Sequence, residues 1–254
     1  MTAQRAYWKI PIQDTQEFLV KIPEHQFASA PIHDYEKLGA PYDNASPYAV
    51  RDSVLKALVK AQEYLQRHHP QWRLYIFDAY RPLAVQSFMA NHAYKSLLQE
   101  KGLENQKLDN ELEKEIWSEV YKIWAPPNDN PLTPPPHSTG AAVDLTIFDE
   151  ENQTCINMGS PIDEMSERSQ PLHFQELATQ TDLDPATLHH ATEAAKHRHI
   201  LLEAMNHAEF ERHPGEWWHF CLGDQMWVWL SQEKHPERVA AQYGRYDLLN
   251  QGMA

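Results

Sequence analysis

The stretch HSTGAAVD, residues 137–144, decides how we interpret the fold of this chain. Three consecutive prolines at 134–136 fix the backbone that enters it, and Gly140 permits a tight turn. From that turn, residues 141–148 predict a strand, in which side chains alternate between two faces. One face of the strand carries the small or polar side chains of Ala142, Asp144 and Thr146, and the other carries Val143, Leu145 and Ile147.

Asp144 is an isolated carboxylate inside this apolar strand. A buried lone carboxylate is costly unless it is paired or bound to a cation. Two interpretations stay open at this point. Asp144 either accepts hydrogen bonds from a neighbouring loop, or it joins His137, at the start of the same stretch, in holding a metal ion.

A second segment, Glu216-Trp217-Trp218-His219, supplies one more imidazole and one more carboxylate among large aromatic side chains. Catalytic zinc is typically held by three nitrogen or oxygen ligands and keeps one open position, and such a ligand set suits zinc better than magnesium or calcium. We therefore predict one Zn²⁺ per chain, held by His137, Asp144 and His219. Glu216 is then free to act as general base, taking a proton from the attacking water and passing it to the leaving amine. A four-residue match of this kind is common by chance, so it needs support from elsewhere in the chain.

Arg81 is the candidate for charge stabilisation. It follows an apolar, aromatic-rich run at 72–77 that suits a buried strand, and functional residues often lie where strands end. Hydrolysis of an amide develops negative charge on the former carbonyl oxygen, which a fixed guanidinium stabilises. The alternative is an ordinary salt bridge from Arg81 to Asp78 or another acid.

The remaining pattern favours an α+β fold with an antiparallel sheet, because helices and short strands are interspersed without βαβ regularity. Apolar periodicity, prolines and caps predict helices over 52–67, 83–99, 110–124 and 185–206. Further strands are expected at 154–158, 216–220 and 225–230. We expect one domain over 1–254, with an irregular N-terminal wrap at 1–50, a helical insert-like segment at 102–130 and a C-terminal tail at 231–254.

Composition excludes two classes of partner. The formal charge of −14, without any cluster of Lys and Arg, argues against nucleic acid binding. No stretch reaches the roughly 18 apolar residues of a membrane helix, and the N-terminus lacks the apolar run of a signal peptide. With only two cysteines, Cys155 and Cys221, a reducing cytoplasm is the expected compartment. The sequence leaves a homo-oligomer open.

Four motifs together resemble the D-alanyl-D-alanine dipeptidases, the VanX-type zinc peptidases, in order and in spacing. They are Asp78-Ala79-Tyr80-Arg81-Pro82, His137-x-x-Gly140-x-Ala142-x-Asp144, Met158-Gly159-Ser160-x-x-Asp163-x-Met165-x-Glu167-Arg168-Ser169, and Glu216-Trp217-Trp218-His219-Phe220. The resemblance implies a fold shared with Hedgehog-type domains, a central antiparallel sheet flanked by helices. It also implies hydrolysis of D-alanyl-D-alanine to two D-alanines, in cell-wall precursor turnover or glycopeptide resistance.

The same resemblance implies roles for single residues. His137, Asp144 and His219 are the expected zinc ligands, Glu216 the base and Arg81 the transition-state arginine. Asp163 matches the position that binds the free amino group of the dipeptide. Such an aspartate rejects substrates extended at the N-terminus, because their neutral amide leaves a buried carboxylate unpaired.

One position departs from the family. Members often carry a serine two residues before the first histidine ligand, where it helps to hold the substrate carboxylate, whereas this chain has Pro135. Ser138 or a nearby backbone amide is the expected substitute, and Tyr80 is a further candidate for a substrate contact. The departure keeps two alternatives in the same chemistry open, a D,D-carboxypeptidase and a dipeptidase of other specificity. A catalytically inactive zinc-binding module is the alternative of another class.

Overall fold

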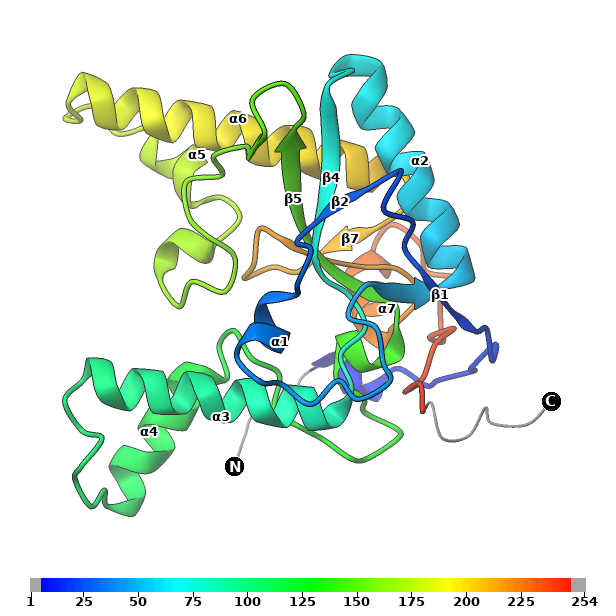
Figure 1. The fold of residues 1–254 in the computed structure, drawn as a ribbon. Helices are drawn as coiled ribbons and strands as arrows, with labels where there is room; N and C mark the ends of the chain where they lie inside the picture. Colours follow the sequence, from blue (N-terminus) through cyan, green and yellow to red (C-terminus); the bar gives the residue numbers. More distant parts are fainter. Residues whose placement is uncertain (1–5, 248–254) are drawn as a thin grey trace.

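A computed structural model describes residues 6–247, and a six-stranded sheet lies at its centre (Figure 1). The strands follow the order β2-β4-β5-β8-β7, with β6 paired to the far end of β5, and every pairing except the parallel β2–β4 pair is antiparallel. The strands are β2 (Ala28–Ser29), β4 (Trp72–Asp78), β5 (Ala142–Asp149), β6 (Thr154–Cys155), β7 (Glu211–Arg212) and β8 (His219–Cys221). The expected α+β fold is confirmed. A small second sheet pairs β1 (Leu19–Lys21) with β3 (Ala49–Arg51).

The main core lies between the sheet and two long helices, α2 (Asp52–His68) and α6 (Pro185–His207), which pack against each other. Asp184 caps α6, because its side chain accepts hydrogen bonds from the first free amides of that helix. The predicted alternation on β5 is confirmed, since one face is wholly buried in this core. Its members from the strand and the two helices include Val143, Leu145, Ile147, Val54, Leu58, Leu65 and Leu201.

A second helical pair lies apart from these two helices (Figure 1) and consists of α3 (Leu83–Glu100) and α4 (Asn110–Val120). Their apolar faces share a cluster with Tyr35 of the short helix α1 (Asp34–Lys37) and with Trp124. The segment at 102–130, predicted only as a helical insert, therefore packs on α3 and brings Trp124 toward the end of the sheet.

One predicted element is wrong. Residues 225–230 form the helix α7 (Gln225–Ser231) instead of a strand. The alternation of Met226, Val228 and Leu230 was misleading because this helix is buried on several sides, so apolar positions recur at every spacing. Asp224 is the signal that identifies it, since its side chain accepts a hydrogen bond from the Trp227 amide as an N-cap.

Arg51 joins the two ends of the described chain to the turn that carries His137. Its side chain is buried and donates to the carbonyl oxygens of Glu17, Thr139 and Gly244. Its guanidinium also lies over the rings of Tyr243 and Tyr246, at 5.3 and 4.8 Å from their centroids. The N-terminal wrap and the tail are thus both packed against the body, where Ile12 and Ala241 form a parallel bridge.

Short helical turns complete the described chain. They are η1 (Ala6–Lys9), η2 (Pro136–Thr139), η3 (Glu167–Ser169) and α5 (His173–Leu177). None of the helices at 6–247 is long and apolar enough to cross a membrane. Both cysteines are free; Cys221 is buried and Cys155 is exposed.

Candidate metal centre and its surroundings

Three neighbouring strands set polar side chains side by side at one end of the sheet. Asp78 at the end of β4 is opposite Asp144 on β5, and Asp144 is opposite His219 on β8. Directly opposed residues in antiparallel strands project from the same face, with side chains close together. The register of the sheet therefore brings together residues that are 66 and 75 positions apart in the sequence.

His137 joins this row from the turn η2, which leads into β5. The turn is closed by Gly140, whose φ of 72° lies in the left-handed region. A side chain at this position would also collide with Leu19. The prolines before His137 and the glycine after it hold the imidazole over the start of β5, as the sequence predicted.

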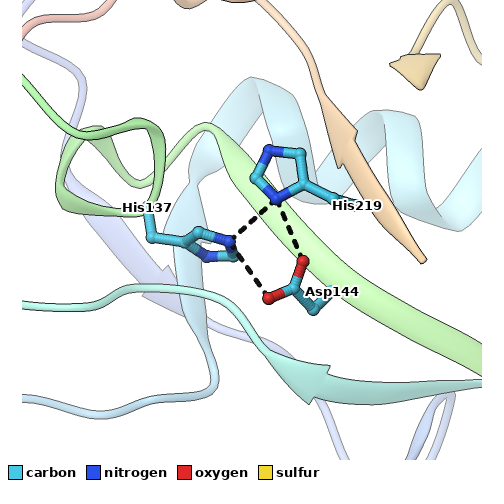
Figure 2. A group of neighbouring side chains, drawn as sticks. All are labelled: His137, Asp144 and His219. Atoms are coloured by element: carbon cyan, nitrogen blue, oxygen red, sulfur yellow. Dashed lines mark hydrogen bonds and ion pairs between the residues drawn. The ribbon is translucent and has the colours of Figure 1, made fainter. Parts of the chain in front are cut away.

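The three expected ligands converge on one point (Figure 2), and their candidate ligand atoms all lie within 4.8 Å of one another. His137 Nε2 is 3.2 Å from Asp144 Oδ2, and His219 Nδ1 is 3.0 Å from Asp144 Oδ1. The two imidazole nitrogens are 3.1 Å apart. All three side chains are buried.

Hydrogen bonding outside the cluster fixes which nitrogen of His137 faces it. His137 Nδ1 lies 2.7 Å from the carbonyl oxygen of Ala79, which can only accept, so Nδ1 carries the proton. The lone pair on Nε2 is then directed at the cluster, which is the arrangement typical of a metal-ligating histidine. His219 lacks this support, because its Nε2 is buried and has no hydrogen-bond partner in the described chain.

Burial and mutual contact shift the pKa values of all three cluster residues. Burial alone would raise the pKa of Asp144, but His137 and His219 hold it well below its usual value. Burial lowers the pKa of His219 and so favours the neutral ring, the form that binds metals. For His137 burial acts in the same direction, but the Asp144 charge outweighs it and raises the pKa. Two imidazole nitrogens and one carboxylate that converge on one point fit a divalent metal ion.

Arg81 forms a salt bridge with Asp78, which was the alternative interpretation of this residue. It also contacts Asp144 of the cluster. Its Nε donates to Asp78 Oδ2 at 2.9 Å, while its Nη2 lies 3.3 Å from Asp144 Oδ2. Asp78 is fully buried and accepts further contacts from Tyr42 and His33 at 2.9 and 3.1 Å. Burial raises the pKa of Asp78, but Arg81 and His33 bring it below its usual value. Asp78 thus stays ionised and holds the guanidinium beside the cluster.

Glu216 lies next to the cluster without belonging to its three closest members. Its Oε2 is 3.7 Å from His219 Nδ1, and its Oε1 is 3.5 Å from His213 Nδ1. The residue is 6% exposed and lines the same small cavity as the cluster. A carboxylate at this distance is placed to exchange a proton with a molecule bound at the cluster.

Asp163 lines the other side of this cavity and is held by Tyr35, whose hydroxyl donates to Oδ2 at 2.7 Å. Burial, and next the charge of Asp144, raises the pKa of Asp163 to about 7. The residue has a φ of 65°, in the left-handed region that non-glycine residues seldom adopt. A backbone held in this way is common at functional sites.

Two expected substrate contacts do not lie at the cavity. The hydroxyl of Ser138 donates to the Pro135 carbonyl within its own turn, at 2.8 Å. The hydroxyl of Tyr80 donates to the carbonyl of Tyr246 in the tail, also at 2.8 Å. Both side chains are buried and neither lines the cavity, so their assignment as substrate-binding groups stays a prediction without support from this geometry. The hydroxyl of Ser138 is bonded within the turn, and that of Tyr80 is bonded to the tail.

Several lining residues were missed from the sequence. They are Gln86, Trp124 and His213, and behind them Tyr35, which bonds the lining residue Asp163, was missed as well. Trp124 lies over the Arg81 guanidinium, 5.0 Å from it, and Gln86 accepts from Arg81 Nη1 at 3.0 Å. Of these residues, only His213 could have been found from the sequence. It lies three residues before Glu216, next to the Pro214-Gly215 turn.

The cavity between these groups is small, about 30 Å³. That is room for one or two water molecules. The aromatic residue Trp124 and its neighbours Ile123 and Ala125 form the side contributed by the segment after α4.

Comparison with known proteins identifies the family. Residues 28–240 match the family model Peptidase_M15, described as D-ala-D-ala dipeptidase. A D-alanyl-D-alanine dipeptidase of Synechocystis sp. is 43% identical over 97% of this chain and 98% of its own length. Proteins of the same name match more locally. The Enterococcus faecium protein is 32% identical over 35% of this chain and 37% of its own length, and the Escherichia coli protein 36% over 34% and 37%.

The match spans all the strands of the large sheet and every residue of the cluster described above. Both a family model over most of the chain and a relative over nearly all of it agree with the resemblance carried by the four motifs. The chain belongs to the D-Ala-D-Ala dipeptidase family and is a peptidase of this metal-dependent family.

Proposed function

We propose that this peptidase hydrolyses D-alanyl-D-alanine to two molecules of D-alanine and that one Zn²⁺ per chain is its metal. The observation that carries the proposal is the convergence of His137, Asp144 and His219, with Glu216 beside them and Arg81 in contact with Asp144. The names of the relatives supply the substrate. The two-histidine, one-aspartate set supplies the argument for zinc.

The chain's own residues then divide the work. When bound, zinc supplies positive charge that polarises the scissile carbonyl and makes the attacking water more acidic. Glu216 takes the proton of that water on its carboxylate and delivers it to the leaving amine. Arg81, oriented by Asp78, stabilises the negative charge that develops on the former carbonyl oxygen.

Substrate selection is assigned to Asp163. Its carboxylate lies in the same cavity as the cluster, where it would pair with the ammonium group of a free dipeptide. An N-acylated substrate carries a neutral amide there and leaves the carboxylate without a counter-charge, which disfavours binding. Ser138 is bonded within its turn, so a backbone group near Pro135 and Pro136, which line the cavity, is the remaining candidate for the substrate carboxylate.

The wider assignments remain part of this proposal. The packed N-terminal wrap and tail support one catalytic domain over the described chain. The two free cysteines support a reducing compartment, for which we propose the cytoplasm, and the substrate supports a role in cell-wall precursor turnover or glycopeptide resistance. A homo-oligomer stays open.

Zinc-loaded protein tested on three peptides decides between the proposal and its alternatives. We expect rapid cleavage of D-Ala-D-Ala, with slow or no cleavage of N-acetyl-D-Ala-D-Ala and of L-Ala-L-Ala. Equal rates on the acetylated peptide would instead indicate a D,D-carboxypeptidase. Full zinc content without cleavage of any of the three would indicate a zinc-binding module that has lost catalysis.

A further inference from the structure

The loop at 158–170 carries Asp163 and separates two hollows of the molecule. Asp163 lines the small cavity that holds the cluster. On the other side, residues of the same loop line an open groove of about 780 Å³ together with Phe174 and Trp217. The loop follows β6 and precedes α5 (Figure 1), and its middle part belongs to no strand. Something other than the sheet must therefore fix the position of Asp163.

Arg198 on α6 bonds both ends of this loop. Its Nε donates to the carbonyl of Met158 at 2.7 Å and its Nη1 to that of Gln170 at 2.8 Å. Its Nη2 donates to Ser160 Oγ at 3.1 Å and to the carbonyl of Arg168 at 2.8 Å. One guanidinium thus joins the first and last residues of the loop with four hydrogen bonds, a geometry that a planar group with five donors can satisfy.

The guanidinium makes these bonds at a cost. Arg198 is 2% exposed and forms no ion pair with a carboxylate in the part of the chain that the structure describes. Burial, and next the charge of Arg212, lowers the pKa of Arg198 to about 9. Its charge is instead accommodated by carbonyl oxygens and by the rings of Phe174 and Trp217, at 4.7 and 5.1 Å. The charge of Glu164 offsets part of this burial cost, while the groups that accept hydrogen bonds from Arg198 are all neutral.

The same network reaches the segment of Glu216. The indole nitrogen of Trp217 donates to Ser160 Oγ at 3.0 Å, and the Trp217 amide donates to the Ser169 carbonyl at 3.1 Å. At the start of the loop, Gly159 has a φ of 87° and lies so close to Phe174 that a side chain would collide with the ring. The unfavourable φ of Asp163 persists only when surrounding contacts hold the backbone.

We propose that Arg198 is a positioning residue that fixes the loop at 158–170, and through it the Asp163 carboxylate, so that it controls selection for substrates with a free amino group. The proposal rests on the function assigned above to Asp163. Arg198 touches neither the cluster nor the substrate, and it acts only through the loop.

Arg198→Met and Arg198→Lys test this role against Arg67→Met, a control at an exposed arginine that bonds only a carbonyl within α2. Losing hydrogen bonds of a charged group corresponds to about a 10- to 100-fold effect, and we expect Arg198→Met to raise KM for D-Ala-D-Ala by that factor. We expect kcat and zinc content to change little, because ammonium binding contributes equally to the ground and transition states. The preference for D-Ala-D-Ala over its N-acetylated form should fall by a similar factor. Arg198→Lys should recover only part of the loss, because a single ammonium cannot reach both ends of the loop.

A measurement without turnover separates this proposal from the proposed function. Amide hydrogen exchange at 161–166 should be faster in Arg198→Lys than in the wild type or Arg67→Met. Unchanged exchange there, or folded and zinc-loaded Arg198 variants with the wild-type KM and substrate preference, would overturn the positioning role. Should Arg198→Met not fold, Arg198→Lys gives the decision. Wild-type protein that leaves D-Ala-D-Ala intact would refute the proposed function and leave the exchange result standing.

Discussion

The sheet side of the cavity and its loop side differ in what holds their functional groups. Asp78, Asp144 and His219 stand opposite one another on three paired strands, so backbone hydrogen bonds fix their spacing. Asp163 and Glu216 come from irregular segments, where side chains such as those of Arg198 and Trp217 bond the backbone in place.

The comparison separates two kinds of requirement. A metal ion needs ligand atoms placed to within a few tenths of an ångström, which rigid strands supply. Recognition of one end of a small substrate needs a group that can be changed without disturbing the ligands, which a loop allows. Substitutions on the sheet side should therefore abolish the chemistry, whereas substitutions on the loop side should change its rate or its selectivity.

The largest effect is expected on the sheet side, from His219→Ala. One of three ligands is lost while the strand pairing of β8 remains, so zinc content and activity should both fall to background in folded protein. Zinc stoichiometry, circular dichroism and turnover measure this. His199→Ala, at an exposed histidine of α6, is the control. Retention of a full equivalent of zinc by His219→Ala would remove that residue from the ligand set.

A smaller effect is expected from Glu216→Gln, on the loop side. The amide keeps the shape of the side chain but cannot accept the proton, so turnover should fall by about 10²–10⁴ while zinc stays bound. Glu203→Gln, an exposed residue of α6, is the matched control. Parallel loss of zinc in Glu216→Gln would mean that this carboxylate is a ligand instead of a base, and the division between the two sides would need to be redrawn.

The smallest of the three effects is expected from Asp163→Asn, and it appears in the dependence of kcat/KM on pH. Because burial raises the pKa of Asp163 to about 7, the carboxylate is protonated below that pH and cannot pair with the substrate ammonium. In the wild type, kcat/KM for D-Ala-D-Ala should rise through about pH 7 and fall again as the substrate amine, with a pKa of about 8, loses its proton.

Asp163→Asn should lose the rise on the acidic side and cleave free and N-acetylated D-Ala-D-Ala at similar rates. Asp182→Asn, at an exposed aspartate, should keep the wild-type profile and preference. An unchanged acidic limb in Asp163→Asn would assign that ionisation to another group of the cavity.

The sequence allowed the sheet side to be predicted well. Alternation on residues 141–148 correctly separated the face of Asp144 from the face buried in the core, and the proline run and Gly140 located the turn of His137. These signals are local, since period-two patterning and backbone restriction act within a few residues. Convergence with His219 was expected from the ligand count and from the resemblance to the family, and the structure brings the three residues together.

The loop side could not be predicted in the same way. Trp124 reaches the cavity, and Tyr35 reaches Asp163 beside it, through packing of the segment after α4 and of α1, for which no local pattern exists. Ser138 was expected to contact the substrate in place of the serine that is absent at Pro135, yet its hydroxyl donates a hydrogen bond within its own turn. At α7, near-complete burial hid the helical period, and only the cap at Asp224 distinguished helix from strand.

The hydrogen bonds of Arg51 affect how far the chain can be shortened. The family match covers 28–240, yet Arg51 secures the His137 turn to Glu17 on one side of that range and to Gly244 on the other. A protein shortened to residues 28–240 would keep His137, Asp144 and His219. Arg51, which bonds the turn of His137, would lose its hydrogen bonds to Glu17 and Gly244. We therefore expect a stable catalytic unit to need residues on both sides of the range that the family model matches.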